Sequence, residues 1–191
     1  MTIERIQVTK NSALLKMRVL DLGTRELMEH YKSTLNWWQD EYNFSGRKVK
    51  SPRLISLMGD KDYTYSGVEH KAAPWDSETT ALKDLCYDRF GFGNYNHNGV
   101  LFNHYRDGKD SISPHSDKED GIDLSVPIMS INLGQTRTFY IQAGNDVFSV
   151  PLADGDGILM IGLFQQECKH WVPKEPKCKG ERINLTFRKF W

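Results

Sequence analysis

The chain has 191 residues, of which 39% are hydrophobic and 26% charged, so it is long enough to bury one core and too short for two full domains. No segment approaches the roughly 18 consecutive apolar residues of a membrane span, and the first residues lack the apolar region of a secretory signal. We expect a single domain, residues 1–191, that acts as a monomer without a membrane partner. The expected compartment is the cytoplasm, or the nucleus if the organism is eukaryotic.

The net charge is zero, which argues against a nucleic-acid binder because such domains are often strongly basic. The charges are unevenly placed, however. Residues 1–53 hold ten Lys/Arg against six Asp/Glu, residues 167–191 hold seven against three, and the middle of the chain is acidic. Two basic ends suit a phosphate backbone held near a metal-binding pocket. A solvated surface of mixed sign gives the same counts, and charge alone favours that interpretation.

The three cysteines are too few and too scattered for a disulfide framework, which fits a reducing compartment. Cys168 and Cys178 flank His170 and offer the ligand types of a zinc site. Their spacing matches no familiar zinc pattern, so ordinary thiols are the favoured interpretation.

Apolar residues at helical spacing predict two helices in the first half of the chain. The first begins with Thr24 as its N-cap and runs to about Tyr42. The second is capped by Asp76 or Ser77 and stopped by Gly91. Strand-like runs lie at residues 14–22, 54–58 and 63–65, and a basic stretch covers residues 47–53.

After Gly99 the pattern changes to short β-rich runs separated by turn residues, at 100–105, 126–133, 138–142, 147–152, 158–161 and 183–187. Many short strands at this spacing indicate a sandwich or barrel and not βαβ units. The predicted fold class is therefore mainly β, with helices that precede and flank the β core.

Polar side chains alternate along three segments, and alternate residues of a strand share one face. The segments are Asn103-x-Tyr105, His115-x-Asp117 and Arg182-x-Asn184-x-Thr186-x-Arg188. In the last segment the intervening residues are apolar and can enter the core. A surface strand gives the same alternation, but two arginines, an amide and a hydroxyl on an inner face need an anionic partner.

His115 and Asp117 alone are weak evidence, because His-x-Asp occurs by chance in many proteins. With the distant His170 they complete the two-histidine, one-carboxylate triad of non-haem iron(II) oxygenases, which leaves positions open for a chelating cosubstrate and oxygen. The cosubstrate 2-oxoglutarate carries two carboxylates. Arg182 and Arg188, about 20 Å apart along a strand, can receive it because the arginine fork pairs bidentately with carboxylate.

Motifs along most of the chain after Pro52 strengthen this hypothesis. They include Tyr63-Thr64-Tyr65-Ser66-Gly67, Asn103-His104-Tyr105-Arg106-Asp107-Gly108, His115-Ser116-Asp117-Lys118-Glu119 and Arg182-Ile183-Asn184-Leu185-Thr186-Phe187-Arg188. Together they resemble the AlkB family of iron(II)- and 2-oxoglutarate-dependent nucleic-acid dealkylating dioxygenases. The resemblance implies a double-stranded β-helix (jelly roll) as catalytic core at residues 99–191. Residues 1–98 would then hold the N-terminal helices and a nucleotide-recognition segment.

The resemblance also implies roles for individual residues. His115, Asp117 and His170 would bind iron(II), with O2 as co-reactant. Arg182 and Tyr105 would hold the distal carboxylate of 2-oxoglutarate, and Arg188 and Asn103 the carboxylate beside the iron, with Asn184 and Thr186 lining the same pocket.

A base must leave the helical stack and be held between flat or apolar groups before its alkyl carbon can be attacked. By the resemblance Tyr65 would stack on one face of the base, with His115 opposite, while Tyr63 and Ser66 shape the edge of the pocket. Glu119 would contact the base, which suits cationic lesions. Without the resemblance, the alternation of Tyr63 and Tyr65 indicates only a half-buried strand.

The expected function is oxidative demethylation of 1-methyladenine- and 3-methylcytosine-type lesions in alkylated DNA, with RNA as a further candidate. The resemblance implies a strand-separating hairpin in members that act on duplex DNA. The candidate for it here is the basic stretch at 47–53, which matches no clear hairpin motif, so single strands are favoured over duplex. Two alternatives remain open at this point. One is a 2-oxoglutarate-dependent hydroxylase of a protein or small molecule, and the other is a binding module that has lost its chemistry.

Overall fold

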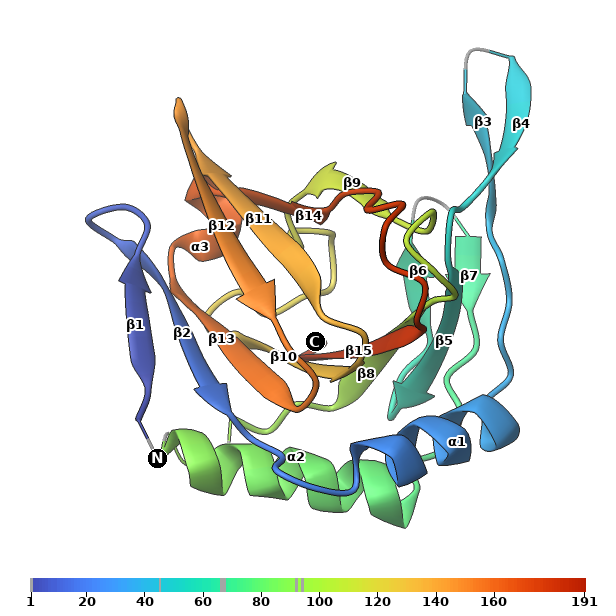
Figure 1. Ribbon diagram of the computed structural model, residues 1–191, viewed down its shortest axis with the longest axis horizontal. Helices are drawn as coiled ribbons and strands as arrows, with labels where there is room; N and C mark the ends of the chain where they lie inside the picture. The colour runs from blue at the N-terminus through green and yellow to red at the C-terminus, as the bar shows by residue number, and fades with distance from the viewer. Residues whose placement is uncertain (1, 45, 66–67, 92, 94) are drawn as a thin grey trace.

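A computed structural model describes residues 2–44, 46–65, 68–91, 93 and 95–191. Two antiparallel sheets face each other, and two helices cover the outer face of the larger one (Figure 1). This arrangement confirms the predicted mainly β fold with flanking helices and a jelly-roll core. Among the described residues, no helix is both long and apolar enough to cross a membrane.

The larger sheet has the strand order β1-β2-β13-β10-β15-β8-β5 and the smaller sheet the order β12-β11-β14-β9. The strands of the larger sheet are β1 (Glu4–Gln7), β2 (Ser12–Arg18), β13 (Asp156–Gly162), β10 (Ile128–Gly134), β15 (Arg182–Arg188), β8 (Gly99–Tyr105) and β5 (Leu54–Gly59). Those of the smaller sheet are β12 (Asp146–Leu152), β11 (Arg137–Ala143), β14 (Lys169–Val172) and β9 (Ile112–His115). Three strands from the first 98 residues thus complete the larger sheet.

Two apolar layers hold the fold together. One lies between the larger sheet and the helices α1 (Thr24–Thr34) and α2 (Ser77–Phe90), and the other fills the space between the two sheets. Strand β15 contributes Ile183, Leu185 and Phe187 to the helix-facing layer, as its alternation predicts. Its polar residues consequently face the space between the sheets.

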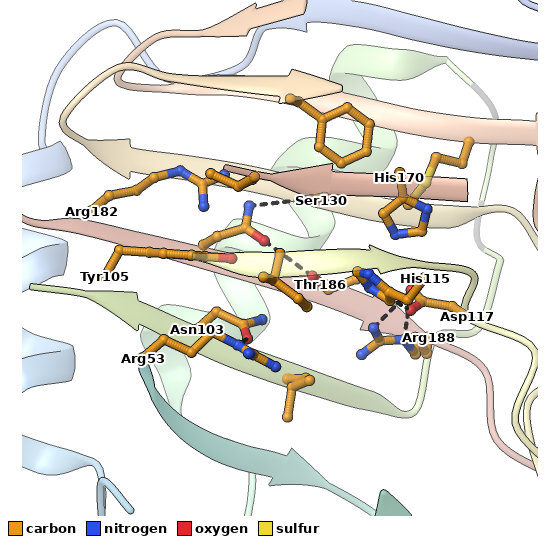
Figure 2. A pocket seen from close by; sticks show the side chains of 16 residues that line it. Arg53, Asn103, Tyr105, His115, Asp117, Ser130, His170, Arg182, Thr186 and Arg188 are labelled. Carbon is orange, nitrogen blue, oxygen red and sulfur yellow. Dashed lines mark hydrogen bonds and ion pairs between the residues drawn. The ribbon is translucent and has the colours of Figure 1, made fainter. Parts of the chain in front are cut away.

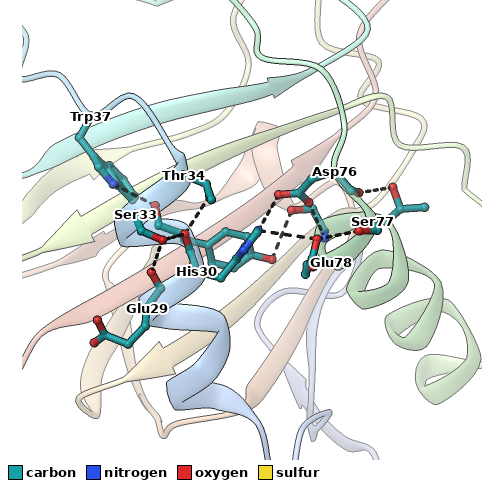
Figure 3. Close-up of polar contacts among 11 residues, drawn as sticks. Glu29, His30, Ser33, Thr34, Trp37, Asp76, Ser77 and Glu78 are labelled. Carbon is teal, nitrogen blue, oxygen red and sulfur yellow. Dashed lines mark hydrogen bonds and ion pairs between the residues drawn. The ribbon is translucent and has the colours of Figure 1, made fainter.

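The two helices contact each other through the start of α2 (Figure 3). As predicted, Asp76 caps α2: its carboxylate accepts a hydrogen bond from the Thr79 N–H at 2.7 Å. The same carboxylate lies 2.9 Å from Nε2 of His30 on α1. The fully buried Tyr31 of α1 also receives a hydrogen bond from Thr79, at 3.3 Å. The cap of one helix therefore fixes the position of the other.

The first helix is shorter than the predicted one. It ends at Thr34, and Leu35 is already extended. Trp38 instead exchanges two backbone hydrogen bonds with Ile55, at 3.0 and 2.9 Å. This pairing with β5 outweighs the helical spacing of the apolar residues. The expected N-cap is also wrong, because Gly23 occupies the cap position and the Thr24 hydroxyl donates to Asp154 at 2.7 Å.

Two hairpins extend the N-terminal half: β3 (Glu41–Phe44) with β4 (Arg47–Lys50), and β6 (Tyr63–Tyr65) with β7 (Val68–His70). The β3–β4 hairpin projects from the body of the molecule (Figure 1). The basic stretch at residues 47–53 supplies its second strand and the connection to β5. Strands β1, β3, β4, β7, β9 and β14 were not among the predicted strand-like runs, because they are short and carry no sustained β-rich run. A short helix, α3 (Phe164–Glu167), precedes β14.

Candidate active site

All nine residues predicted to bind the metal or the cosubstrate line one pocket between the two sheets (Figure 2). They come from β8, β9, β14, β15 and the loop after β9. Strands distant in sequence thus deliver their polar faces to a common space. These residues are Asn103, Tyr105, His115, Asp117, His170, Arg182, Asn184, Thr186 and Arg188.

The pairing of β15 with β8 explains why two of the sequence motifs meet. Arg182 lies opposite Tyr105, and Asn184 lies opposite Asn103. Cross-strand partners in an antiparallel pair point to the same face of the sheet. The alternation seen separately in the two segments is therefore one polar surface.

The three candidate metal ligands come together at one end of the pocket. His115 is the last residue of β9, and His170 lies opposite it on β14. Asp117 follows in the loop. Each offers one ligand atom, and these atoms lie within 4.8 Å of one another. The carbonyl oxygen of Ser113 lies 2.9 Å from Nδ1 of His115 and accepts a hydrogen bond from it, and Nε2 of the same ring lies 3.5 Å from Asp117.

The electrostatics of this cluster suit a metal ion. Burial alone would raise the pKa of Asp117, but the charge of Arg188 and the two neighbouring histidines hold that pKa well below its usual range. Arg188 donates to the carboxylate of Asp117 at 2.8 and 3.2 Å. Burial lowers the pKa of His170 to about 3, so its imidazole is neutral at pH 7. A carboxylate and neutral imidazoles are the forms that bind metals.

The loop that carries Asp117 is held from the opposite side by the segment around α3. The Asp117 N–H donates to the side-chain oxygen of Gln165 at 2.9 Å, and the Ser116 hydroxyl donates to the Cys168 carbonyl at 2.9 Å. Gln165 is 6% exposed. These two bonds fix the loop that presents the carboxylate.

The other end of the pocket suits an anion. Arg182 is 2% exposed, its guanidinium lies 4.8 Å from the ring centre of Tyr105, and its Nε donates to Asn132. Within the described part of the chain, the buried Nη1 atoms of Arg182 and Arg188 have no hydrogen-bond partner. Leaving buried donors unpaired is costly. A ligand with two carboxylates supplies acceptors for both, so the pocket fits 2-oxoglutarate as well as a divalent metal.

Arg53 is a pocket residue for which the sequence predicted no role. It precedes β5, is 4% exposed, and donates to the side-chain oxygen of Asn103 at 2.7 Å. It also donates to Ser51 at 3.2 Å. In the sequence Arg53 is only the last residue of the basic stretch at 47–53, because burial of an arginine cannot be inferred before the pairing of β5 with β8 is known.

Of the residues predicted to bind the base, His115 lines this pocket, whereas Tyr63 and Glu119 do not belong to its lining. Tyr63 is 5% exposed and packs on Phe190, with ring centres 4.9 Å apart. Burial, and a hydrogen bond with Glu119, raise the pKa of Tyr63. Among the described atoms, one buried oxygen of Glu119 has no partner. Tyr65 belongs to β6, but its side chain lies outside the described part of the structure, as does Ser66.

The strand spacing of His115 and Asp117 does not continue to Glu119. Strand β9 ends at His115, and the Glu119 carbonyl accepts a hydrogen bond from the Ile122 N–H at 3.2 Å in a turn. Glu119 therefore reaches Tyr63 from a loop and not from a strand face.

Comparison with known proteins gives concordant matches. The family model of the 2OG-Fe(II) oxygenase superfamily matches residues 20–188. Alpha-ketoglutarate-dependent dioxygenase alkB homolog 3 of Rattus norvegicus is 35% identical over 149 residues, 72% of this chain and 50% of that protein. DNA oxidative demethylase ALKBH2 of Homo sapiens is 31% identical over 156 residues, 75% of this chain and 59% of that protein.

The chain therefore spans about half the length of the curated relatives it matches. A solved structure of OsALKBH1 superposes with a TM-score of 0.67 and 18% identity, and the match covers 97% of this chain and 100% of that one. At that identity the likeness concerns the fold.

Proposed function

Because the chain belongs to the 2OG-Fe(II) oxygenase superfamily and, within it, to the AlkB family, we propose that it demethylates N-alkylated bases oxidatively, using iron(II), 2-oxoglutarate and O2. The substrates are lesions of the 1-methyladenine and 3-methylcytosine type in DNA. One observation carries the proposal. A single pocket joins a two-histidine, one-carboxylate cluster to two buried arginines with unpartnered N–H groups among the described residues.

His115, Asp117 and His170 would hold the metal, since they are the residues of the pocket with this ligand chemistry. When bound, iron(II) activates O2 for the oxidation of both 2-oxoglutarate and the N-methyl carbon. The protein holds Asp117 ionised through Arg188 and orients His115 through the Ser113 carbonyl. The ligand set is therefore prepared before the metal binds.

The cosubstrate lies along the polar face of β15 and β8. Arg182 and Tyr105 receive the distal carboxylate, while Arg188 and Asn103 receive the carboxylate nearer the metal. Arg188 suits this position because two of its nitrogens contact Asp117 and its Nη1 is left for a further acceptor. Asn184 and Thr186 line the space between these ends.

The methylated base binds beside the triad, against the β6–β7 hairpin. In this proposal Tyr63 borders the base and Glu119 contacts the cationic ring, while the stacking role expected of Tyr65 and the edge role expected of Ser66 fall on side chains outside the described structure. The buried, unpartnered oxygen of Glu119 supports this role within the described structure, because it offers an acceptor and a negative charge. The exposed strand β4 (Arg47–Lys50) contributes basic side chains to a nucleic-acid strand, with single-stranded DNA preferred over duplex.

The alternative, a hydroxylase of a protein or small molecule, is not favoured. The relatives include enzymes named as DNA oxidative demethylases. Binding of methylated single-stranded DNA that weakens steeply with salt separates the two functions.

The testing experiment incubates the protein with iron(II), ascorbate, 2-oxoglutarate and a methylated single-stranded oligonucleotide, and measures demethylation by mass spectrometry. We expect His115→Ala, Asp117→Ala and His170→Ala each to abolish demethylation, because the triad has no spare ligand. His30→Ala is the matched control, since His30 belongs to another His–carboxylate cluster, with Asp76 and Glu78, outside the pocket. Full activity of a triad variant contradicts the assignment of that residue.

A further inference from the structure

Asn132 is a fully buried amide next to the pocket but outside its lining. It lies on β10, opposite Asn184 of β15, and its exposed fraction is 0%. Its side chain contacts the turn between β12 and β13 on one side and Arg182 on the other. Its backbone carbonyl accepts from the Gly155 N–H of the same turn at 2.7 Å. Asn132 of β10 thus connects Arg182 of β15 to the end of β12 and to the turn that follows it.

The orientation of this amide is fixed by its partners. Nδ2 donates to the carbonyl oxygens of Leu152 and Ala153 at 3.2 and 2.9 Å. An oxygen in that place would face two other oxygens, so the reversed orientation is excluded. Oδ1 consequently faces Arg182 and accepts the hydrogen of its Nε.

The hydrogen bond between Asn132 and Nε of Arg182 determines which guanidinium nitrogens can bind a ligand. With Nε engaged and the guanidinium placed over the Tyr105 ring, the buried Nη1 has no partner among the described residues. None of the ion pairs of the described chain includes Arg182. The neutral amide therefore orients the cation without cancelling its charge. The contrast is Arg188, which is paired with the carboxylate of Asp117.

We propose that Asn132 is a positioning residue that holds Arg182 in the orientation that receives the distal carboxylate of 2-oxoglutarate and leaves its full charge for that ligand. The inference rests on the proposed function, because it presupposes a carboxylate at Arg182. An aspartate at position 132 would do the opposite. It would pair with Arg182 directly, and its second oxygen would face the Leu152 and Ala153 carbonyls.

The test is calorimetric titration of 2-oxoglutarate into anaerobic, iron(II)-loaded protein. We expect Asn132→Ala and Asn132→Asp each to weaken 2-oxoglutarate binding about tenfold, with iron(II) affinity unchanged. In an Arg182→Lys background, Asn132→Ala is expected to add little further loss, because residues that act through one contact are not additive. Should Asn132→Ala fail to fold, Asn132→Ser replaces it, since its hydroxyl can still donate to a turn carbonyl.

Asp154→Ala is the matched control. Asp154 lies on the same turn and accepts a hydrogen bond from the Gly134 N–H at 2.7 Å, but within the described structure it makes no hydrogen bond or ion pair with Arg182. It should lower the melting temperature without changing 2-oxoglutarate affinity. Unchanged affinity in the Asn132 variants, or an equal loss in the Arg182→Lys background, overturns the inference alone. Absence of 2-oxoglutarate binding by the wild type overturns the proposed function and the inference with it.

Discussion

Replacing Arg188 with leucine separates the protein's own stabilisation of Asp117 from that supplied by a metal. The two side chains are 6% and 4% exposed and lie 2.8 Å apart. Removing one partner of a buried pair leaves an uncompensated charge, which costs about 3–5 kcal/mol. We therefore expect Arg188→Leu to reduce the stability of the metal-free protein by about that amount. A divalent metal replaces the missing positive charge, so it should restore part of the loss.

The assay is chemical denaturation of both proteins with and without manganese(II), a redox-stable substitute for iron(II). Binding at about 100 times the dissociation constant stabilises a folded protein by about 2.7 kcal/mol. The gain should be larger for Arg188→Leu than for the wild type. Arg106→Leu is the control, because Arg106 pairs with Asp110 at 2.7 Å outside the pocket, and manganese should not restore its loss. If manganese stabilises Arg188→Leu no more than the wild type, Asp117 is not at the metal site.

Three further outcomes are expected. Arg182→Lys should raise the apparent KM for 2-oxoglutarate about tenfold in a succinate assay, because lysine keeps the charge and loses the fork; an unchanged KM would place the cosubstrate elsewhere. Glu119→Ala should reduce repair of cationic 3-methylcytosine more than repair of neutral 3-methylthymine, whereas an equal reduction would remove the charge argument. Burial lowers the pKa of His97 from 6.5 to about 4, so unfolding takes up a proton and stability should fall by about 3 kcal/mol from pH 7 to pH 4. Urea titrations should show a smaller fall in unfolding free energy between pH 7 and pH 4 for His97→Gln than for the wild type. An equal fall in both proteins would assign the acid sensitivity to other groups.

The prediction from sequence was most accurate for the two faces of a strand, because alternating polar and apolar residues show which side chains share a face. The seven residues of β15 give both faces correctly: the apolar ones enter the core and the polar ones line the pocket. The predicted first helix was too long because residues 35–38 keep a helical apolar spacing, while the backbone of Trp38 pairs with Ile55 of β5. Tertiary pairing of this kind leaves no local signal.

In the candidate active site, too, residues that act through tertiary contacts could not be predicted from the sequence. His115, Asp117 and His170 could be named because their residue types are rare in combination and specific to one chemistry. Arg53, Asn132 and Gln165 could not, since each acts through contacts between segments far apart in the chain. A buried arginine or amide is indistinguishable from a surface one until the strand order is known.

The most direct test of the account is to quantify succinate and demethylated base in the same reaction, with 3-methylcytosine in a single-stranded oligonucleotide as substrate. We expect the two products in equal amounts, since one cosubstrate is consumed for each methyl group removed. We also expect neither product with Asp117→Ala. Succinate that forms at the same rate with and without the oligonucleotide, while the methyl group stays in place, would contradict the proposed nucleic-acid substrate.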